Sequence, residues 1–238
     1  MSIPGVDAWL NSAQGRYILE WEQDRLDAAV ADIFGFNALQ LGLPACDFLR
    51  ANRIPLRQTA GDCGQTDVRC ALTALPFAAL STDLVVLPHA LEFSDDPHQI
   101  LREVERILIP EGQIVILGFN PLSLWGLKQR FDRSGTFPWN GSYLSITRLK
   151  DWLKLLGFEV DRATQGRYAP PLSLQNNLQG WKLVESAGER WWHFSGGVYM
   201  LRAIKRVHGM HLITPEWRKK PVGAKALRPV AHKETHGH

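Results

Sequence analysis

Two polar residues follow apolar runs of the sequence, and their side chains could do chemistry. His89 comes just after Leu84–Leu87, and Asn120 comes just after Ile114–Leu117. An imidazole that titrates near neutral pH can take a proton from a substrate group, and an amide can orient one. Each residue could instead serve the fold, His89 by capping a strand end and Asn120 by forming a turn. Both roles stay open for both residues.

Other residues of chemically useful type have simpler interpretations. Asp95 and Asp96 resemble a pair of catalytic carboxylates, but Pro97 follows them, and this order is typical of a helix cap and its first turn. The three cysteines, at 46, 63 and 70, lack the C-x-x-C spacing of a zinc site and are odd in number. We therefore expect a helix start at the aspartates, and neither a metal site nor a disulfide framework.

The elements that must position these residues can be read from apolar spacing. A helix is predicted from Pro97 to the stop signal at 110–112, because its apolar residues recur on one side: Ile100, Leu101, Val104, Ile107 and Leu108. The continuous apolar run 113–118 then predicts a parallel strand buried on both faces. Strand, helix and strand imply a right-handed crossover.

The same pattern recurs on both sides of this unit. Downstream, Thr147 is predicted to cap a helix that ends at Gly157, and a strand begins at 158. Upstream, a helix ends at Gly35 and the first strand with its turn covers 37–42. Alternating helices and strands of this kind indicate an α/β fold.

Several motifs of the chain resemble those of the class I methyltransferase family. They are "LPF" at 75–77, "DLVVLPHALE" at 83–92 and "WLKLLGFEV" at 152–160, and the segment 118–127 also resembles the bacterial YafS-type proteins. The resemblance implies a doubly wound, mostly parallel, seven-stranded Rossmann-like sheet whose last strand, 197–205, is antiparallel. It also implies S-adenosylmethionine as the cofactor and transfer of a methyl group to a small or medium-sized acceptor.

The resemblance assigns residues as well. His89 and Asn120 would be catalytic, by orienting the nucleophilic atom of the acceptor. The cofactor-binding positions it implies lie at the carboxyl ends of the first, third and fourth strands: Gln40, Gly42, Leu43, Leu72, Leu87, Pro88 and His89.

The chain departs from the family pattern at three points. Gly42 is the one glycine left in the loop after the first strand, no acidic residue closes the second strand until Asp62, and Ala71 stands where the family has an acidic residue. Each lost hydrogen bond to a buried ligand group costs on the order of 1 kcal/mol or more, so we expect weak cofactor binding. The alternative is a catalytically degenerate binding or scaffold protein, including one associated with RNA.

Composition sets the expected domain organisation. With 238 residues and 45% hydrophobic composition, one sizeable core is expected. We predict a helical extension over 1–36, a methyltransferase-like domain over 37–207 with a lid or insertion over 121–146, and a basic flexible tail over 208–238.

Charge and segment composition suggest partners and a compartment. The net charge is +3, and residues 209–238 alone carry +4, so the tail could hold nucleic acid or an anionic surface. Neither a signal peptide nor a transmembrane segment is recognisable, and a cytoplasmic protein is expected.

Overall fold

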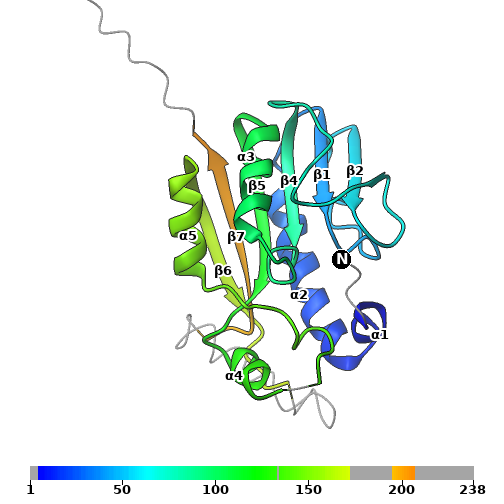
Figure 1. The fold of residues 1–238 in the computed structure, drawn as a ribbon, viewed down its shortest axis with the longest axis vertical. Helices are drawn as coiled ribbons and strands as arrows, with labels where there is room; N and C mark the ends of the chain where they lie inside the picture. Colours follow the sequence, from blue (N-terminus) through cyan, green and yellow to red (C-terminus); the bar gives the residue numbers. More distant parts are fainter. Residues whose placement is uncertain (1–4, 133, 172–194, 207–238) are drawn as a thin grey trace, which may run out of the picture. The chain divides into compact units, whose positions relative to one another are not determined.

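The computed structural model describes residues 5–132, 134–171 and 195–206. The predicted basic tail lies outside these residues. Two helices come first, and a sheet with three further helices follows (Figure 1). The helices are α1 Val6–Leu10, α2 Ala13–Val30, α3 Pro97–Ile107, α4 Leu124–Phe131 and α5 Ile146–Leu155. The strands are β1 Asn37–Leu41, β2 Leu56–Gly61, β3 Val68–Arg69, β4 Thr82–Pro88, β5 Leu108–Phe119, β6 Phe158–Gly166 and β7 Val198–Lys205.

The seven strands form one sheet in the order β3-β2-β1-β4-β5-β7-β6. Strands β1 to β5 pair in parallel, and β7 runs antiparallel to both β5 and β6. The strand order reverses between β1 and β4, which makes their carboxyl ends the switch point where ligands bind in such sheets. The predicted fold class is therefore confirmed, including the antiparallel last strand.

The sheet is buried on both faces because its central strands are apolar on both sides. In β4, Leu84 and Val86 pack in the core beneath α2, whereas Val85 and Leu87 pack in the core beneath α3 and α5. This alternation follows from the two-residue period of a strand. Figure 1 shows α2 behind the sheet and α3 and α5 in front of it.

Helix starts agree with capping chemistry, with one correction. The Asp96 carboxylate accepts from the Gln99 backbone N–H at 2.9 Å, so the expected cap before Pro97 is confirmed. The prediction that Thr147 caps the next helix is wrong. Ser145 caps it, and α5 begins at Ile146. Both residue types are good caps, and the cap at Ser145 starts the helix two residues earlier than a cap at Thr147 would.

The strand after α3 also begins earlier than predicted. Leu108, expected as the end of the helix, opens β5 and is fully buried. Pro110 and Gly112 look like a stop signal, but they lie within β5, where Glu111 takes a left-handed φ of 65°. The β4–β5 register shifts between Thr82 and Leu84, so the irregularity is absorbed as a bulge rather than as a loop.

Candidate cofactor and acceptor site

The side chain of Gln40 holds the loop after β1 through hydrogen bonds to the loop backbone. This side chain is fully buried, and its Nε2 donates to the backbone oxygens of Gly42, Leu43 and Cys46 at 3.1, 3.0 and 2.8 Å. Its Oε1 accepts from the Phe48 N–H at 3.0 Å. Gln40 therefore fixes the path of the loop, and it is not among the residues that line the nearby cavity.

The loop turns sharply where it faces the switch point. Gly42 has a φ of 90° and Leu43 a φ of 42°, so two consecutive residues are left-handed. A Cβ at Gly42 would lie 3.6 Å from the Ala90 Cβ, which leaves room, so the constraint at this position is the backbone conformation. The hydrogen bonds of the Gln40 side chain fix this loop conformation, in which Gly42 is the one glycine.

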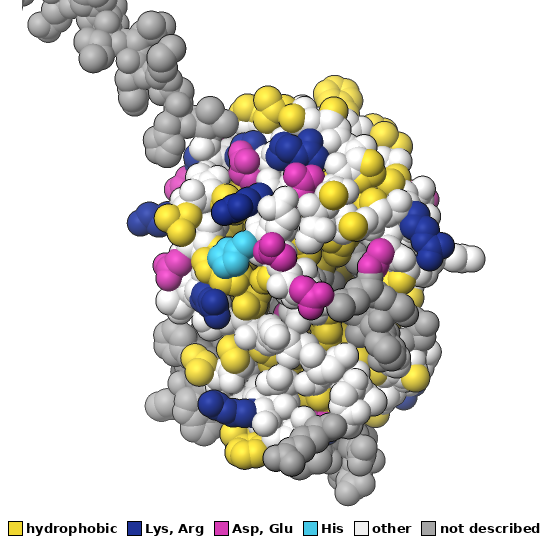
Figure 2. All heavy atoms as spheres, in the orientation of Figure 1, with side chains coloured by type: hydrophobic (Ala, Val, Ile, Leu, Met, Phe, Trp, Pro, Cys, Tyr) yellow, Lys and Arg dark blue, Asp and Glu magenta, His cyan; other side chains and the backbone are white. Residues whose placement is uncertain are grey.

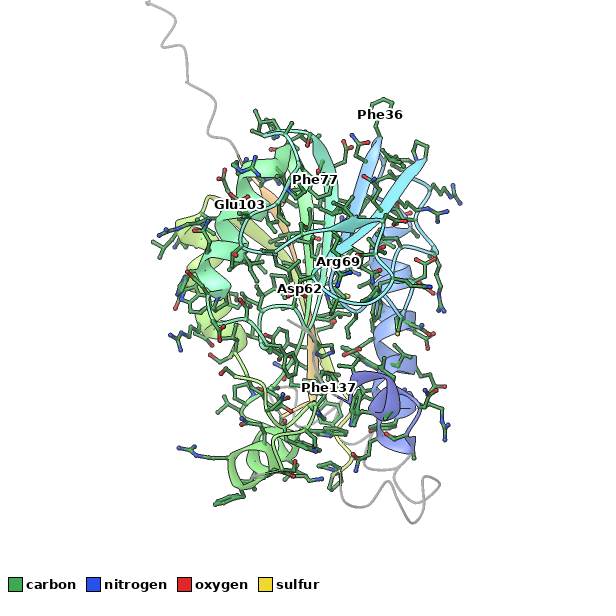
Figure 3. The ribbon with its side chains drawn as sticks, turned by 45° about the vertical axis from the view of Figure 1, so that its right-hand side comes forward. Phe36, Asp62, Arg69, Phe77, Glu103 and Phe137 are labelled. Carbon is green, nitrogen blue, oxygen red and sulfur yellow. The ribbon has the colours of Figure 1, made fainter. Side chains whose placement is uncertain are left out.

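An acidic residue does close β2. The strand extends to Gly61, whose carbonyl accepts from the Cys70 N–H at 2.9 Å, and Asp62 comes directly after it. Sequence reasoning placed the end of this strand around 54–60 and treated Asp62 as displaced. The structure corrects that boundary, and Asp62 lines the cavity at the carboxyl ends of the strands. Figure 3 labels Asp62 in the middle of the view, just below Arg69 of β3.

The cavity itself has a volume of about 740 Å³. Its apolar walls include Leu43, Leu72 and Ile100, and three aspartates also line it, Asp62, Asp95 and Asp96. Among the described residues, no Lys or Arg lines it. Acidic side chains also gather around the middle of this face in Figure 2. The cavity therefore favours a ligand that combines an apolar ring with positive charge.

Most of the positions predicted to bind the cofactor meet at this cavity. Gly42, Leu43, Leu72, Pro88 and His89 line it. Leu87 does not, because its side chain is fully buried against the α3 side of the sheet.

His89 is enclosed by two carboxylates that the sequence analysis did not assign to the site. Its Nε2 lies 2.7 Å from Glu22 Oε1 on α2, and its Nδ1 lies 2.9 Å from Glu92 Oε2. The other oxygen of Glu92 accepts from the Phe119 N–H. All three ionisable side chains are at most 3% exposed. The His89–Glu92 spacing of three residues was visible in the sequence, whereas Glu22 lies 67 positions away and gave no signal.

These contacts determine the charge of the imidazole. Burial by itself would lower the pKa of His89, but the attraction of Glu22, its hydrogen bond and the contacts of Glu92 outweigh burial and raise the pKa to about 10. Burial also raises the pKa of Glu92, against the opposing effect of the His89 charge. At neutral pH His89 is therefore an imidazolium with both nitrogens engaged, and it is a poor proton acceptor.

Asn120 lies away from the main cavity. Its Nδ2 donates to Gln165 Oε1 at 3.1 Å and to the Gly196 carbonyl at 3.0 Å, while its Oδ1 accepts from the Leu122 N–H at 3.0 Å. The last of these bonds is the Asx-type turn that the sequence left open. Asn120 lines a second cavity of about 550 Å³ near the start of α5. The geometry thus favours a turn-forming role.

Comparison with known proteins gives concordant matches. A family model described as a methyltransferase domain matches residues 45–116. YafS of Escherichia coli strain K12 is 32% identical over 172 residues, which cover 71% of this chain and 72% of YafS.

Two solved structures share the fold at low identity. An S-adenosylmethionine-dependent methyltransferase from Thermotoga maritima matches with a TM-score of 0.64 at 16% identity, covering 84% of this chain and 94% of that one. The cyclase SpnF matches with a TM-score of 0.51 at 18% identity, covering 84% of this chain and 86% of its own. Since SpnF is a cyclase, the fold alone does not fix the reaction.

Proposed function

Because the chain belongs to the YafS-type proteins of the class I S-adenosylmethionine-dependent methyltransferase family, we propose that it binds S-adenosylmethionine in the cavity at the switch point. It then transfers the methyl group to a small or medium-sized acceptor. The observation that carries this proposal is the match between the cavity and the cofactor in position, size and charge.

The cavity fits the cofactor on three counts. It lies beyond the carboxyl ends of β1, β2 and β4, where this kind of sheet binds its ligands. Its volume of about 740 Å³ is within the range of small-molecule sites. Its three carboxylates, with no Lys or Arg among the described lining residues, suit a ligand that carries a sulfonium and an ammonium group.

Individual residues would divide the binding between them. The Asp62 carboxylate would accept hydrogen bonds from the ribose hydroxyls, because it stands at the end of β2. Leu72 and Ile100 would cover the adenine with apolar surface, and the loop at Gly42 would allow the backbone to approach the amino-acid part. With Asp62 in this role, one of the three departures from the family pattern is compensated, which weakens the argument for a degenerate scaffold.

The chemistry would depend on positioning. The bound sulfonium supplies an electrophilic methyl group, and the chain contributes orientation of the acceptor and exclusion of water. His89 would not remove a proton from the acceptor, since Glu22 and Glu92 keep its imidazole protonated. It would instead connect the end of β4 to helix α2 through its contact with Glu22, at the wall of the cavity.

A calorimetric titration with S-adenosylhomocysteine tests the proposal. The unaltered protein should bind it with one site, and Asp62→Asn should weaken binding by about tenfold, since it removes the charge from hydrogen bonds worth about 1.5–3 kcal/mol. Asp24→Asn, an exposed aspartate on α2 outside the cavity, is the matched control and should bind like the unaltered protein.

Two results would contradict the proposal in different ways. No binding by a folded, unaltered protein would reject the cofactor. Binding that is equally tight in Asp62→Asn and Asp24→Asn would reject the placement of the ribose while keeping the cofactor.

A further inference from the structure

Helix α4 carries an apolar stripe that is largely exposed in the described part of the chain. Leu124, Leu127 and Phe131 recur at spacings of three and four, so they share one side of the helix, and they are 49%, 53% and 76% exposed. Leu122, which precedes the helix, is 76% exposed as well. Contiguous exposed apolar surface of this kind marks an interaction site more often than a single exposed leucine does.

The opposite side of the same helix is firmly held in the core. Trp125 is fully buried, its Nε1 donates to the Ala169 carbonyl at 3.0 Å, and its ring stacks on Phe119 and Trp139. The Ser123 side chain caps the helix by accepting from the Gly126 N–H at 3.1 Å. The exposed stripe is therefore presented by a well-anchored helix, and it is not the result of a frayed end.

Basic residues flank the stripe on both sides. At 3.6 residues per turn, Lys128 lies about 70° from the centre of the stripe in one direction and Arg130 about 90° in the other. The segment 121–131 contains no Asp or Glu. The ammonium of Lys128 lies over the Trp139 ring, 4.1 Å from its centre, and burial lowers its pKa, whereas Arg130 is exposed. Long basic side chains with apolar stems beside an apolar stripe are the arrangement found at lipid headgroups.

The helix stands at the same edge of the sheet as the main cavity. It follows directly from the carboxyl end of β5, which runs parallel to β4, and β4 ends at the cavity. In Figure 1, α4 accordingly lies at the lower end of the molecule, below the strands. A surface that covered α4 would thus lie at the same edge of the sheet as the main cavity.

We propose that the apolar stripe of α4, made of Leu122, Leu124, Leu127 and Phe131, docks on an anionic phospholipid surface, with Arg130 at the headgroups. Four apolar side chains are few for a stable protein partner, which takes about 20–30 residues on each side. They suit shallow insertion into a bilayer, where attraction of the basic side chains to anionic lipids adds to apolar burial. Within the described residues, no helix is long and apolar enough to cross a membrane.

Vesicle flotation with the full chain tests this docking. The unaltered protein should float with vesicles of phosphatidylglycerol and phosphatidylcholine in equal amounts, and less with phosphatidylcholine alone. The double variant Leu127→Ser/Phe131→Ser should bind the mixed vesicles about tenfold more weakly or worse, because both side chains lose their apolar burial. Arg130→Glu should weaken binding to the mixed vesicles while leaving phosphatidylcholine binding unchanged.

Phe36→Ser provides the matched control. Phe36 is 76% exposed, as Phe131 is, but Figure 3 shows it at the opposite end of the molecule from α4. Its variant should float like the unaltered protein.

Three outcomes would overturn the proposal. The unaltered chain could fail to bind mixed vesicles, or bind them equally well with and without the α4 substitutions, as it would through its basic tail. Light scattering could also show a dimer that the double variant dissociates, and then a second copy of the chain would cover the stripe.

Discussion

The buried cluster of Glu22, His89 and Glu92 should make the stability of this protein fall as the pH rises above neutral. The folded state raises the pKa of His89 from 6.5 to about 10. Below about pH 6.5 the imidazole is protonated in both the folded and the unfolded chain, and the stabilisation is fully present. It is lost as the pH rises through about 10, where the folded imidazole releases its proton. The raised pKa of Glu92 acts in the same direction, because the folded state holds that proton more firmly as well.

The expected size of the effect follows from the pKa difference. Between 6.5 and about 10, at about 1.4 kcal/mol for each pKa unit, the full contribution of His89 is about 5 kcal/mol. The free energy of unfolding should therefore fall by up to about 1.4 kcal/mol for each pH unit between about 7 and 10. This is a large share of the 5–15 kcal/mol that typically stabilises a domain.

Urea unfolding at several pH values from 7 to 10 measures this slope. His89→Asn keeps a residue that tolerates the left-handed φ of 53° but cannot titrate, so its profile should lack the His89 part of the decline. Asp27→Asn, which breaks the exposed pair with Arg50, should leave the slope unchanged. If the unaltered protein and His89→Asn have parallel profiles over this range, or if NMR shows an imidazole at His89 that titrates near 6.5, the reasoning is refuted.

Two further predictions concern the cavity. Gln40→Leu should lower the free energy of unfolding by about 2–4 kcal/mol, because it leaves buried backbone groups of the loop at Gly42 without their hydrogen-bond partner. Urea unfolding measures this change. Gln23→Leu on α2 is the control and should change the free energy of unfolding little. Ala71→Asp should strengthen S-adenosylhomocysteine binding several-fold in calorimetry, because Ala71 lines the cavity where the family has an acidic residue; unchanged or weaker binding by the folded variant would contradict that placement.

Much of the fold could be predicted because local signals agreed with one another. Helix α3 was predicted closely, since an Asp-Pro cap and helical apolar spacing follow one another there. The ends of helices and strands were predicted less accurately. The start of β5 was placed at 113 instead of Leu108, because Pro110 and Gly112 carry a turn signal that tertiary pairing with β4 overrides.

The candidate site was less predictable, because it depends on where side chains point. The sequence identified Gln40 as a polar residue at a strand end. Only the folded loop shows that its side-chain amide is hydrogen-bonded to backbone groups. The contact of Glu22 with His89 could not be predicted for another reason. Glu22 belongs to a helix that precedes the whole sheet, and nothing in its spacing indicates that packing brings it to His89.

The engagement of these polar groups restricts the reaction that the cavity can support. His89 is unavailable as a base below about pH 10, and the amide of Asn120 is committed to a turn beside a different cavity. The remaining ionisable side chains among the described residues that line the main cavity are Asp62, Asp95, Asp96 and Cys63. An acceptor whose attacking atom already carries a free lone pair at neutral pH would need only orientation. We therefore expect the pH dependence of methyl transfer to report the acceptor's own ionisation, and a step near pH 6.5 that disappears in His89→Asn would contradict this view.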